Sequence, residues 1–328
     1  MNSPEPTESR EPVSPAPSAS VPPVKVRRVA ISLDIGGTKI AAGLVRGDGK
    51  ILVRRTIPTA ADRGGEAVLQ DCLDLIGSFQ REAVKPDGQP VAIGLGICEL
   101  VDLAGNIISD QTIKWRGVPV RERLGGELPV FIEADCRAAA LCEARLGAGR
   151  EFPTFLYVTV GTGISCTLVI EGRPYRGARG ATGTMATSPL PFLCSECGAI
   201  SRTSLEQVAG GPGMVARFNA LSGGGIDGAQ AVVQRATVGE AAARHVVETA
   251  AESLGGMIGT LINVLDPHGV VIGGGLGSAP GIFWEAIARA ARAAIWSESQ
   301  RELPIARASF GADAGLVGAA LVALEERS

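Results

Sequence analysis

The feature that most limits what this chain can fold into is a glycine turn placed directly behind a run of apolar residues. Residues 29–33 predict a buried strand. The turn that follows supplies a carboxylate, two glycines, a hydroxyl and a lysine, namely Asp34, Gly36, Gly37, Thr38 and Lys39. Adjacent glycines let backbone N–H groups approach an anion, and a carboxylate can bind Mg²⁺ together with phosphate oxygens. The turn therefore predicts a phosphate site, with Mg²⁺ at Asp34.

The residues after this turn narrow the kind of phosphate site. Residues 40–45 predict a second strand, and residues 47–49 the turn after it. A P-loop or a dinucleotide-binding turn would open a helix and would have a different glycine spacing. For this turn alone, a plain hairpin that needs glycine for its positive φ stays open as an alternative.

A second copy of the arrangement favours the phosphate interpretation. Residues 155–160 predict a strand and residues 164–170 its return. Between them stand two glycines and a hydroxyl: Gly161, Thr162 and Gly163. Two facing hairpin turns can grip a polyphosphate from both sides. A third glycine cluster follows the strand predicted at 270–272 and leaves room for a flat base and its ribose: Gly273, Gly274 and Gly275.

Length, charge and composition limit the number of domains, the partners and the cellular location that can be expected for this chain. At 328 residues the chain is long enough for two domains. Its net charge of −3 gives no electrostatic case for nucleic acid or an anionic membrane as partner. Residues 1–27 predict a disordered tail without the apolar core of a secretory signal. No apolar run approaches the length of a membrane span, so we expect a cytoplasmic protein. Its seven cysteines predict mostly reduced thiols.

Strands and helices alternate outside the glycine turns. Periodicity predicts strands over residues 91–96 and 130–133, and helices over residues 66–83, 137–146, 283–296 and 315–325. A long apolar helix ends at Asp266 and Pro267. Thr237 and Glu240 have the spacing of a capping box at its start. We expect the last helix to pack back on the first domain.

Further motifs complete a recognisable pattern. They are residues 133–135 (EAD), 176–180 (RGARG), 197–198 (CG), 204–206 (SLE), 265–267 (LDP) and 311–320 (GADAGLVGAA). Together with the three glycine turns, they resemble the ROK family (repressor, open reading frame, kinase) of the actin-like ATPase and sugar kinase superfamily. The resemblance runs from about residue 28 to residue 325.

The resemblance implies a fold and a domain organisation. We expect an α/β protein with the actin-like ATPase / sugar kinase fold, in which two α/β domains enclose an interdomain cleft. The first domain would comprise residues 28–134 with residues 314–328, and the second residues 135–313. ROK repressors carry an N-terminal helix-turn-helix domain, which we do not expect here because the residues before the first strand predict disorder. The long apolar helices suggest a homodimer.

The pattern also implies a catalytic group. Phosphoryl transfer to an alcohol needs a carboxylate that accepts the hydroxyl proton. Asp135 stands at the carboxyl end of a predicted strand, where α/β proteins place their sites, and it matches the position of the ROK family's catalytic aspartate. It can also be the N-cap of the following helix, and the two roles are compatible. The two histidines, His245 and His268, are expected to be structural or exposed.

The acceptor contacts of the ROK pattern are altered in this chain. Ala134 replaces the family's asparagine before the catalytic aspartate. Thr184 and Thr187 stand where the family has the glutamate and histidine that hold sugar hydroxyls. Of the family's sugar contacts, only Glu206 survives besides the aspartate. In the loop where the family has Gly-x-Pro-Gly, Glu99 can hydrogen-bond the acceptor or be exposed, and the sequence does not decide between these roles.

The zinc site of the family is incomplete as well. Cys194 and Cys197 remain, whereas Ser204 and Thr187 occupy the positions of the third cysteine and of the histidine. A structural zinc site needs four Cys or His ligands, so we expect no zinc.

These observations predict an ATP- and Mg²⁺-dependent kinase that transfers the γ-phosphoryl group to a hydroxyl of a sugar or sugar-like polyol, with Asp135 as base. The altered contacts favour an acceptor other than plain glucose, and a C7-cyclitol fits them. A glucokinase-type hexose kinase and a catalytically impaired nucleotide or sugar sensor on the same fold stay open as alternatives. An ATPase of the same superfamily would consume ATP without an acceptor.

Overall fold

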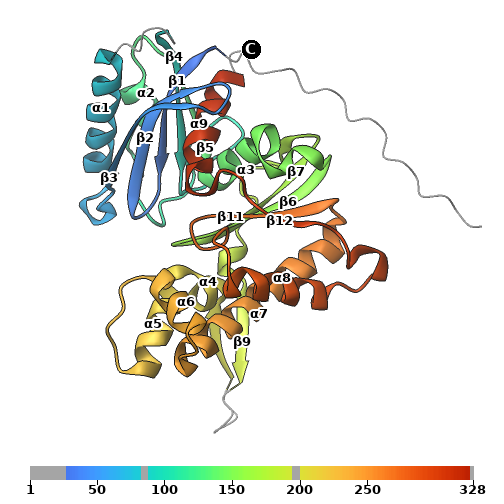
Figure 1. Cartoon of the computed structure of the whole chain (residues 1–328). Helices are drawn as coiled ribbons and strands as arrows, with labels where there is room; N and C mark the ends of the chain where they lie inside the picture. Colours follow the sequence, from blue (N-terminus) through green and yellow to red (C-terminus); the bar gives the residue numbers. More distant parts are fainter. Residues whose placement is uncertain (1–26, 83–87, 194–199, 326–328) are drawn as a thin grey trace, which may run out of the picture.

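The computed structural model describes residues 27–82, 88–193 and 200–325. Two five-stranded sheets form its framework (Figure 1). The first has the order β3-β2-β1-β4-β5 and comprises β1 (Val29–Ile35), β2 (Lys39–Arg46), β3 (Ile51–Pro58), β4 (Pro90–Ile97) and β5 (Val130–Ala134). Strands β1, β2 and β3 are antiparallel neighbours, whereas β4 runs parallel to β1, and β5 parallel to β4.

The second sheet repeats this topology. Its order is β12-β11-β6-β7-β8, and it comprises β6 (Thr154–Val160), β7 (Ile164–Ile170), β8 (Arg173–Pro174), β11 (Gly269–Gly273) and β12 (Ile305–Arg307). Strands β6, β7 and β8 are antiparallel, and β11 and β12 continue the sheet in parallel. The β6–β7 hairpin therefore occupies the same place in its sheet as the β1–β2 hairpin. A separate two-stranded sheet pairs β9 (Pro189–Leu193) with β10 (Ile200–Ser204).

Two helices lie between the sheets. They are α3 (Asp135–Leu146) and α9 (Ala314–Glu325) (Figure 1). On the opposite face of the first sheet lies α1 (Gly65–Arg81), with α2 (Val120–Leu124) near it. Leu141 on α3 packs in the cluster shared with α9, and Ala140 packs in the cluster that contains Phe155 of the second sheet. Because α3 contacts both sheets, the predicted domain boundary at residue 135 stays a prediction.

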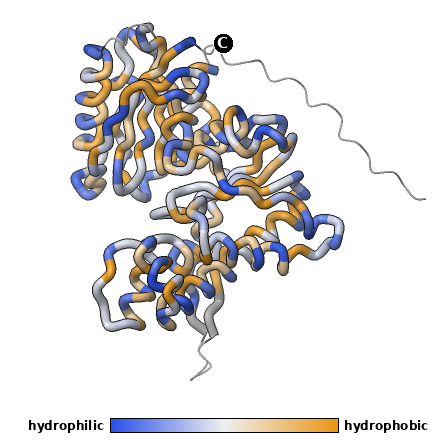
Figure 2. Tube along the Cα trace, viewed as in Figure 1, coloured by the Kyte–Doolittle hydropathy of each residue, from blue (hydrophilic) through white to orange (hydrophobic). Residues whose placement is uncertain are grey.

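Small residues let α9 pack directly on its neighbours, which is where the sequence predicts the last helix to lie. A Cβ atom on Gly94 of β4 would lie 1.9 Å from the carbonyl oxygen of Ala319. A Cβ atom on Gly318 would lie 1.9 Å from the carbonyl oxygen of Ala138 on α3. The hydroxyl of Ser32 donates to the carbonyl of Leu316 at 2.5 Å. Helix α9 is thereby fixed to β1 and β4, and its buried residues are small or apolar as far as Leu324 (Figure 2).

A helical layer covers the other face of the second sheet (Figure 1). It consists of α4 (Leu205–Ala209), α5 (Gly211–Ser222), α6 (Ala229–Thr237), α7 (Ala241–Leu265) and α8 (Ile282–Ala294). Short 3₁₀ helices span Ala61–Arg63, Ala148–Glu151, Met185–Thr187, Glu298–Gln300 and Gly311–Asp313.

The predicted capping box at the start of the long helix is wrong. Thr237 is the last residue of α6, and α7 begins at Ala241 with Glu240 as an N-cap that makes no side-chain hydrogen bond. Gly239 has a φ of +94° and turns the chain between the two helices. The Thr-x-x-Glu spacing therefore spans a helix–helix connection rather than one helix start.

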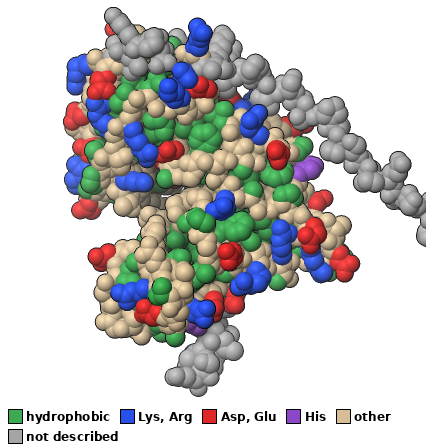
Figure 3. Space-filling model, viewed as in Figure 1, with side chains coloured by type: hydrophobic (Ala, Val, Ile, Leu, Met, Phe, Trp, Pro, Cys, Tyr) green, Lys and Arg blue, Asp and Glu red, His purple; other side chains and the backbone are tan. Residues whose placement is uncertain are grey.

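The surface is mixed in charge. On the face shown in Figure 3, Lys and Arg side chains are interspersed with Asp and Glu side chains. This distribution agrees with the small net charge of −3 and gives no single-signed patch on that face. Among the helices of the described residues, none is both long and apolar enough to cross a membrane.

Candidate active site

The two predicted hairpin turns meet in the structure. The hydroxyl oxygens of Thr38 and Thr162 lie 3.3 Å apart, and both side chains are exposed. The β1–β2 turn is closed by a hydrogen bond from Gly36 N–H to the Lys39 carbonyl at 3.0 Å. The β6–β7 turn is one residue shorter and is closed by a hydrogen bond from Gly161 N–H to the Gly163 carbonyl at 2.9 Å. Two equivalent glycine turns from separate sheets therefore face one another.

The first turn is supported from behind by two neighbouring segments. The hydroxyl of Thr59 donates to the Gly36 carbonyl at 2.6 Å. A Cβ atom on Gly37 would lie 2.6 Å from the methyl carbon of Thr112, so this methyl group packs directly on the glycine. Glycine at position 37 is thus required by a close approach.

The second turn is supported by the start of two helices. The Gly211 N–H at the start of α5 donates to the Gly161 carbonyl at 2.8 Å. Glu206 on α4 accepts a hydrogen bond from the Ile164 N–H at 3.0 Å, and a Cβ atom on Gly163 would lie 2.8 Å from the same carboxylate oxygen. Glu206 is thereby placed against the second hairpin, and its predicted contact with an acceptor stays a prediction.

The third glycine turn lies beside the second hairpin. The N–H groups of Leu276 and Gly277 both donate to the carbonyl of Val160, the last residue of β6, at 3.0 and 3.1 Å. Gly274 has a φ of +81°, and a Cβ atom on Gly275 would meet open space. The turn at 273–275 is therefore held next to the predicted phosphate turn.

Two carboxylates stand near the carboxyl ends of two parallel strands, β1 and β5, which are separated by β4. In the register of the first sheet, Asp34 is opposite Gly96, and Gly96 is opposite Glu133. Asp135 follows two residues later as the first residue of α3. Helix α3 thus begins at Asp135 and has Ala134 as its N-cap, so the predicted N-cap role of Asp135 is wrong by one position. The Asp135 carboxylate instead accepts a hydrogen bond from the Cys136 N–H at 2.6 Å.

The electrostatics of these two carboxylates are coupled. Removal from bulk water, followed by repulsion from Asp135, raises the pKa of Asp34 to about 7, although Lys39 and Arg54 oppose the shift. Removal from bulk water also raises the pKa of Asp135 to about 6, against the hydrogen bond from Cys136. Two carboxylates with raised pKa values at the ends of strands are typical of a functional site, and a bound cation would stabilise their charged forms.

Asp34 also touches the C-terminal helix. A Cβ atom on Gly315, in the first turn of α9, would lie 2.5 Å from one carboxylate oxygen of Asp34. The glycine leaves room for the carboxylate at the N-terminal end of the helix, where a negative charge is favoured.

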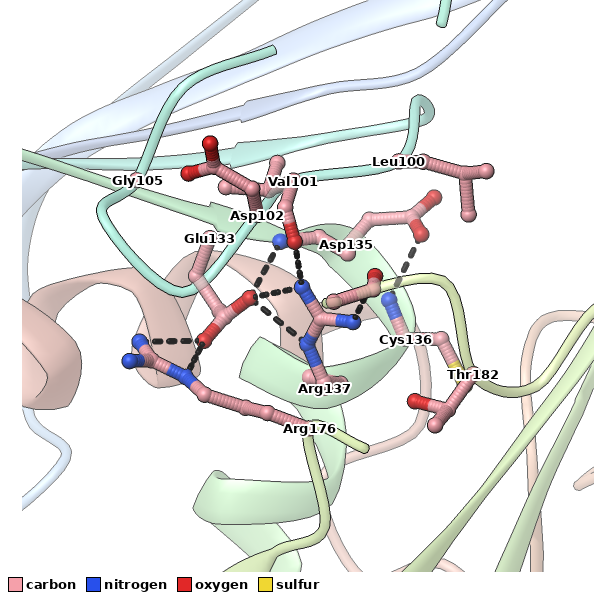
Figure 4. Close-up of polar contacts among 12 residues, drawn as sticks. Leu100, Val101, Asp102, Gly105, Glu133, Asp135, Cys136, Arg137, Arg176 and Thr182 are labelled. Carbon is pink, nitrogen blue, oxygen red and sulfur yellow. Dashed lines mark hydrogen bonds and ion pairs between the residues drawn. The ribbon is translucent and has the colours of Figure 1, made fainter. Parts of the chain in front are cut away.

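A buried ion network flanks Asp135 in the chain and surrounds the start of α3 (Figure 4). The Arg137 guanidinium donates to Glu133 at 2.7 Å, to the Gly180 carbonyl at 2.8 Å and to the Val101 carbonyl at 2.6 Å. Arg176 donates to the other carboxylate oxygen of Glu133 at 2.8 Å. Arg137 and Glu133 are only 2% and 5% exposed. The network therefore joins β5 and α3 to two loops beside Asp135.

Sequence reasoning missed the role of Arg137. Its only local signal is a Glu133–Arg137 pair at i and i+4 that straddles Asp135. The partners at Val101 and Gly180 are remote in sequence, so the spacing alone could not have indicated them.

The structure corrects the expectation for Glu99. The side chain is 5% exposed, so the predicted exposed alternative is wrong. Its carboxylate accepts hydrogen bonds from the hydroxyl of Ser109 and from the N–H groups of Gln111, Thr112 and Ile113. Both oxygens are used inside the protein, so the geometry does not support a direct bond from Glu99 to an acceptor.

The remaining predicted residues are placed as follows. Thr184 and Thr187 are exposed at the two ends of a 3₁₀ turn, where the Thr187 hydroxyl donates to the Thr184 carbonyl at 3.3 Å. His245 and His268 are exposed.

Cys194 and Cys197 lie outside the described residues. Within the described part of the chain, no three His, Cys, Asp or Glu side chains gather in a group that could hold a metal ion.

A separate cavity lies in the first half of the chain. It has a volume of about 320 Å³ and is lined by residues 105–110, 115–122 and Ile132. Neither Asp34 nor Asp135 lines it, so this cavity is distinct from the pair of hairpin turns.

Comparison with known proteins decides the family. A model of the ROK family matches residues 30–326. The chain belongs to the ROK family. The bifunctional enzyme NanE/NanK of Brucella melitensis is 35% identical over 301 residues, which cover 88% of this chain and 53% of that protein. The chain therefore spans about half the length of this curated relative.

Two solved ROK structures share the fold. The ROK hexokinase from Thermus thermophilus is 34% identical, with a TM-score of 0.72, and the match covers 91% of this chain and 99% of that one. A ROK family glucokinase from Streptomyces griseus, in complex with glucose and AMPPNP, is 26% identical, with a TM-score of 0.77 and coverage of 90% and 99%. The predicted actin-like ATPase / sugar kinase fold is confirmed.

Proposed function

We propose that this ROK protein is a kinase that transfers the γ-phosphoryl group of ATP to a hydroxyl of a sugar or sugar-like polyol. The observation that carries the proposal is the meeting of two glycine hairpins, at Thr38 and Thr162, from sheets of identical topology. The relatives support it, since one of the similar structures is a glucokinase bound to glucose and to AMPPNP, an analogue of ATP.

Each glycine turn has a role in nucleotide binding in this proposal. The turns at 36–39 and 161–163 would hold the phosphate groups through their backbone N–H groups, with Lys39 adding a positive charge. The turn at 273–275 would face the adenosine, because an added Cβ atom on Gly275 would meet open space next to the phosphate turn.

The residues present fit a magnesium ion. Asp34 lies at the first phosphate turn against Gly315 of α9, burial and repulsion from Asp135 raise its pKa, and Mg²⁺ binds carboxylate together with phosphate oxygens. Asp34 would hold the ion, directly or through water. Bound Mg²⁺ would supply charge neutralisation on the phosphates of ATP.

Asp135 would act as the general base. With a pKa raised to about 6, its carboxylate is mostly deprotonated at neutral pH and yet more basic than an ordinary aspartate. It could accept the proton of the acceptor hydroxyl as this oxygen attacks the γ-phosphorus. The network of Arg137, Glu133 and Arg176 would hold the start of α3, and therefore the base, in place.

The altered sugar contacts bear on the identity of the acceptor. Ala134, Thr184 and Thr187 replace the family's sugar contacts, which favours an acceptor other than plain glucose, and a C7-cyclitol is our candidate. A glucokinase-type hexose kinase is the second candidate, and the hexokinase and glucokinase among the similar structures favour it.

A coupled ADP-release assay over hexoses, N-acetylhexosamines and cyclitols, with Mg²⁺ and ATP, tests the proposal. We expect ADP release that depends on one class of acceptor. ATP consumption without any acceptor would indicate an ATPase instead. ATP binding without turnover of any acceptor would indicate a sensor, and the absence of ATP binding would overturn the proposal as a whole.

A further inference from the structure

Glu99 is a buried carboxylate for which the proposed reaction has no direct use. It lies two residues after the end of β4 and is 5% exposed. Its oxygens accept backbone N–H groups of Gln111 at 3.0 Å, Thr112 at 2.6 Å and Ile113 at 2.9 Å, together with the hydroxyl of Ser109. Hydrogen bonds to a charged acceptor are stronger than those between neutral groups.

The loop that Glu99 binds has no regular structure of its own. Residues 109–114 form neither helix nor strand, so their N–H groups need an acceptor from elsewhere. Glu99 supplies this acceptor for three successive residues. The hydroxyl of Ser109 completes the arrangement by accepting a hydrogen bond from the Leu100 N–H at 2.8 Å. Glu99 therefore fixes both the position and the direction of this loop.

Because the loop also contacts the first phosphate turn, fixing the loop restricts the position of that turn. The methyl group of Thr112 packs on Gly37, where an added Cβ would approach it to 2.6 Å. Thr38 follows in the chain and makes the 3.3 Å contact with Thr162 of the second turn. Each contact in the series from Glu99 to the paired turns is direct.

We propose that Glu99 is a positioning residue for nucleotide binding. It holds the loop at 109–113 so that the methyl group of Thr112 packs on Gly37 and fixes the position of the first phosphate turn. The inference rests on the proposed function, because it assumes that the turn at 36–39 binds the phosphates of ATP. It predicts that damage to Glu99 weakens nucleotide binding in particular, rather than acceptor binding.

Substitution Glu99→Gln is the first test, with Mg²⁺ and AMPPNP as the probe in titration calorimetry. The amide keeps the size of the side chain, but its NH₂ group cannot accept the Gln111 N–H. We expect the Kd for AMPPNP to rise by up to about tenfold, because one lost hydrogen bond to a charged group sets the upper limit of the change. The KM for the acceptor should change less than the KM for ATP.

Asp102→Asn is the matched control. Asp102 also accepts backbone N–H groups, from Ala104 at 2.9 Å and Asn106 at 2.8 Å, but it does so in an exposed turn that does not touch the phosphate hairpins. The same change from carboxylate to amide should leave the Kd for AMPPNP unchanged there.

A pair of substitutions at Thr112 tests the contact itself and remains informative if Glu99→Gln fails to fold. Thr112→Ser removes the methyl group that packs on Gly37, whereas Thr112→Val keeps a methyl group and removes the hydroxyl. We expect weaker AMPPNP binding for the serine variant and near-normal binding for the valine variant. The double variant Glu99→Gln/Thr112→Ser should bind no more weakly than the weaker single variant.

Two results would overturn the inference. One is a Glu99→Gln protein with a lower melting temperature but unchanged affinity for AMPPNP, and the other is equal affinity in the two Thr112 variants. Both readouts use nucleotide binding without an acceptor. Failure of the proposed function would look different, because the unmodified protein would then bind no AMPPNP or phosphorylate no acceptor.

Discussion

The buried Arg137 allows a quantitative test of how the start of α3 is held. Arg137→Met keeps the length of the side chain and removes all donors to Glu133, Val101 and Gly180. Breaking a buried ion pair from one side costs about 3–5 kcal/mol. Because Arg176 still faces Glu133, we expect the lower end, about 3 kcal/mol. The shift in melting temperature is this loss of free energy divided by the entropy of unfolding, which is about 2.1 cal/mol/K per residue. For a cooperative unit of roughly 300 residues, we therefore expect a melting temperature about 5 °C lower.

Differential scanning calorimetry measures this shift. The control is Arg123→Met, which breaks a 3.2 Å pair with Glu66 whose side chains are 41% and 63% exposed. An exposed pair of this kind contributes about 0–1 kcal/mol, so we expect less than about 2 °C. Equal shifts for the two variants would refute the view that the Arg137 network holds α3 and the adjoining loops together.

Two further predictions concern the carboxylates. Gly315→Ala would place a Cβ 2.5 Å from an Asp34 oxygen, so we expect at least about tenfold lower turnover in a folded protein. Unchanged turnover and unchanged Mg²⁺ dependence in steady-state assays would exclude this contact as functional. The pKa of Asp34 is raised from 3.8 to about 7, so the folded protein retains a proton that the unfolded chain releases across this interval. Without Mg²⁺, stability should therefore fall between about pH 4 and 7, and Asp34→Asn should melt higher than the unmodified protein at pH 8 but not at pH 4. Scanning calorimetry with EDTA at both pH values checks this, and an equal difference at both would contradict it.

The parts of the site that follow from local chemistry were accessible from the sequence. The turns at 36–39 and 161–163 combine glycine pairs with strands on both sides, and this pattern indicates two hairpins, which the structure shows to face one another. Asp34 and Asp135 were found because each follows an apolar strand. The last helix was expected to pack back on the first domain, and the structure shows that small residues let it approach β4 and α3 closely.

The parts that depend on distant partners could not be predicted. Glu99 and Arg137 act through loops that are far from them in sequence, and no spacing rule connects a carboxylate to three N–H groups of an irregular loop. The false capping box at Thr237 has the opposite cause. A local pattern was present, but the φ of +94° at Gly239 ended one helix before the next began.

The central claim is that Asp135 removes the proton of an acceptor hydroxyl while the two glycine turns hold the nucleotide. Single-turnover phosphoryl transfer by Asp135→Asn, measured beside the Kd for AMPPNP, tests it most directly. We predict a rate lower by about 10²–10⁴, the usual contribution of a general base, with an unchanged Kd. A near-normal rate at unchanged affinity would contradict the claim.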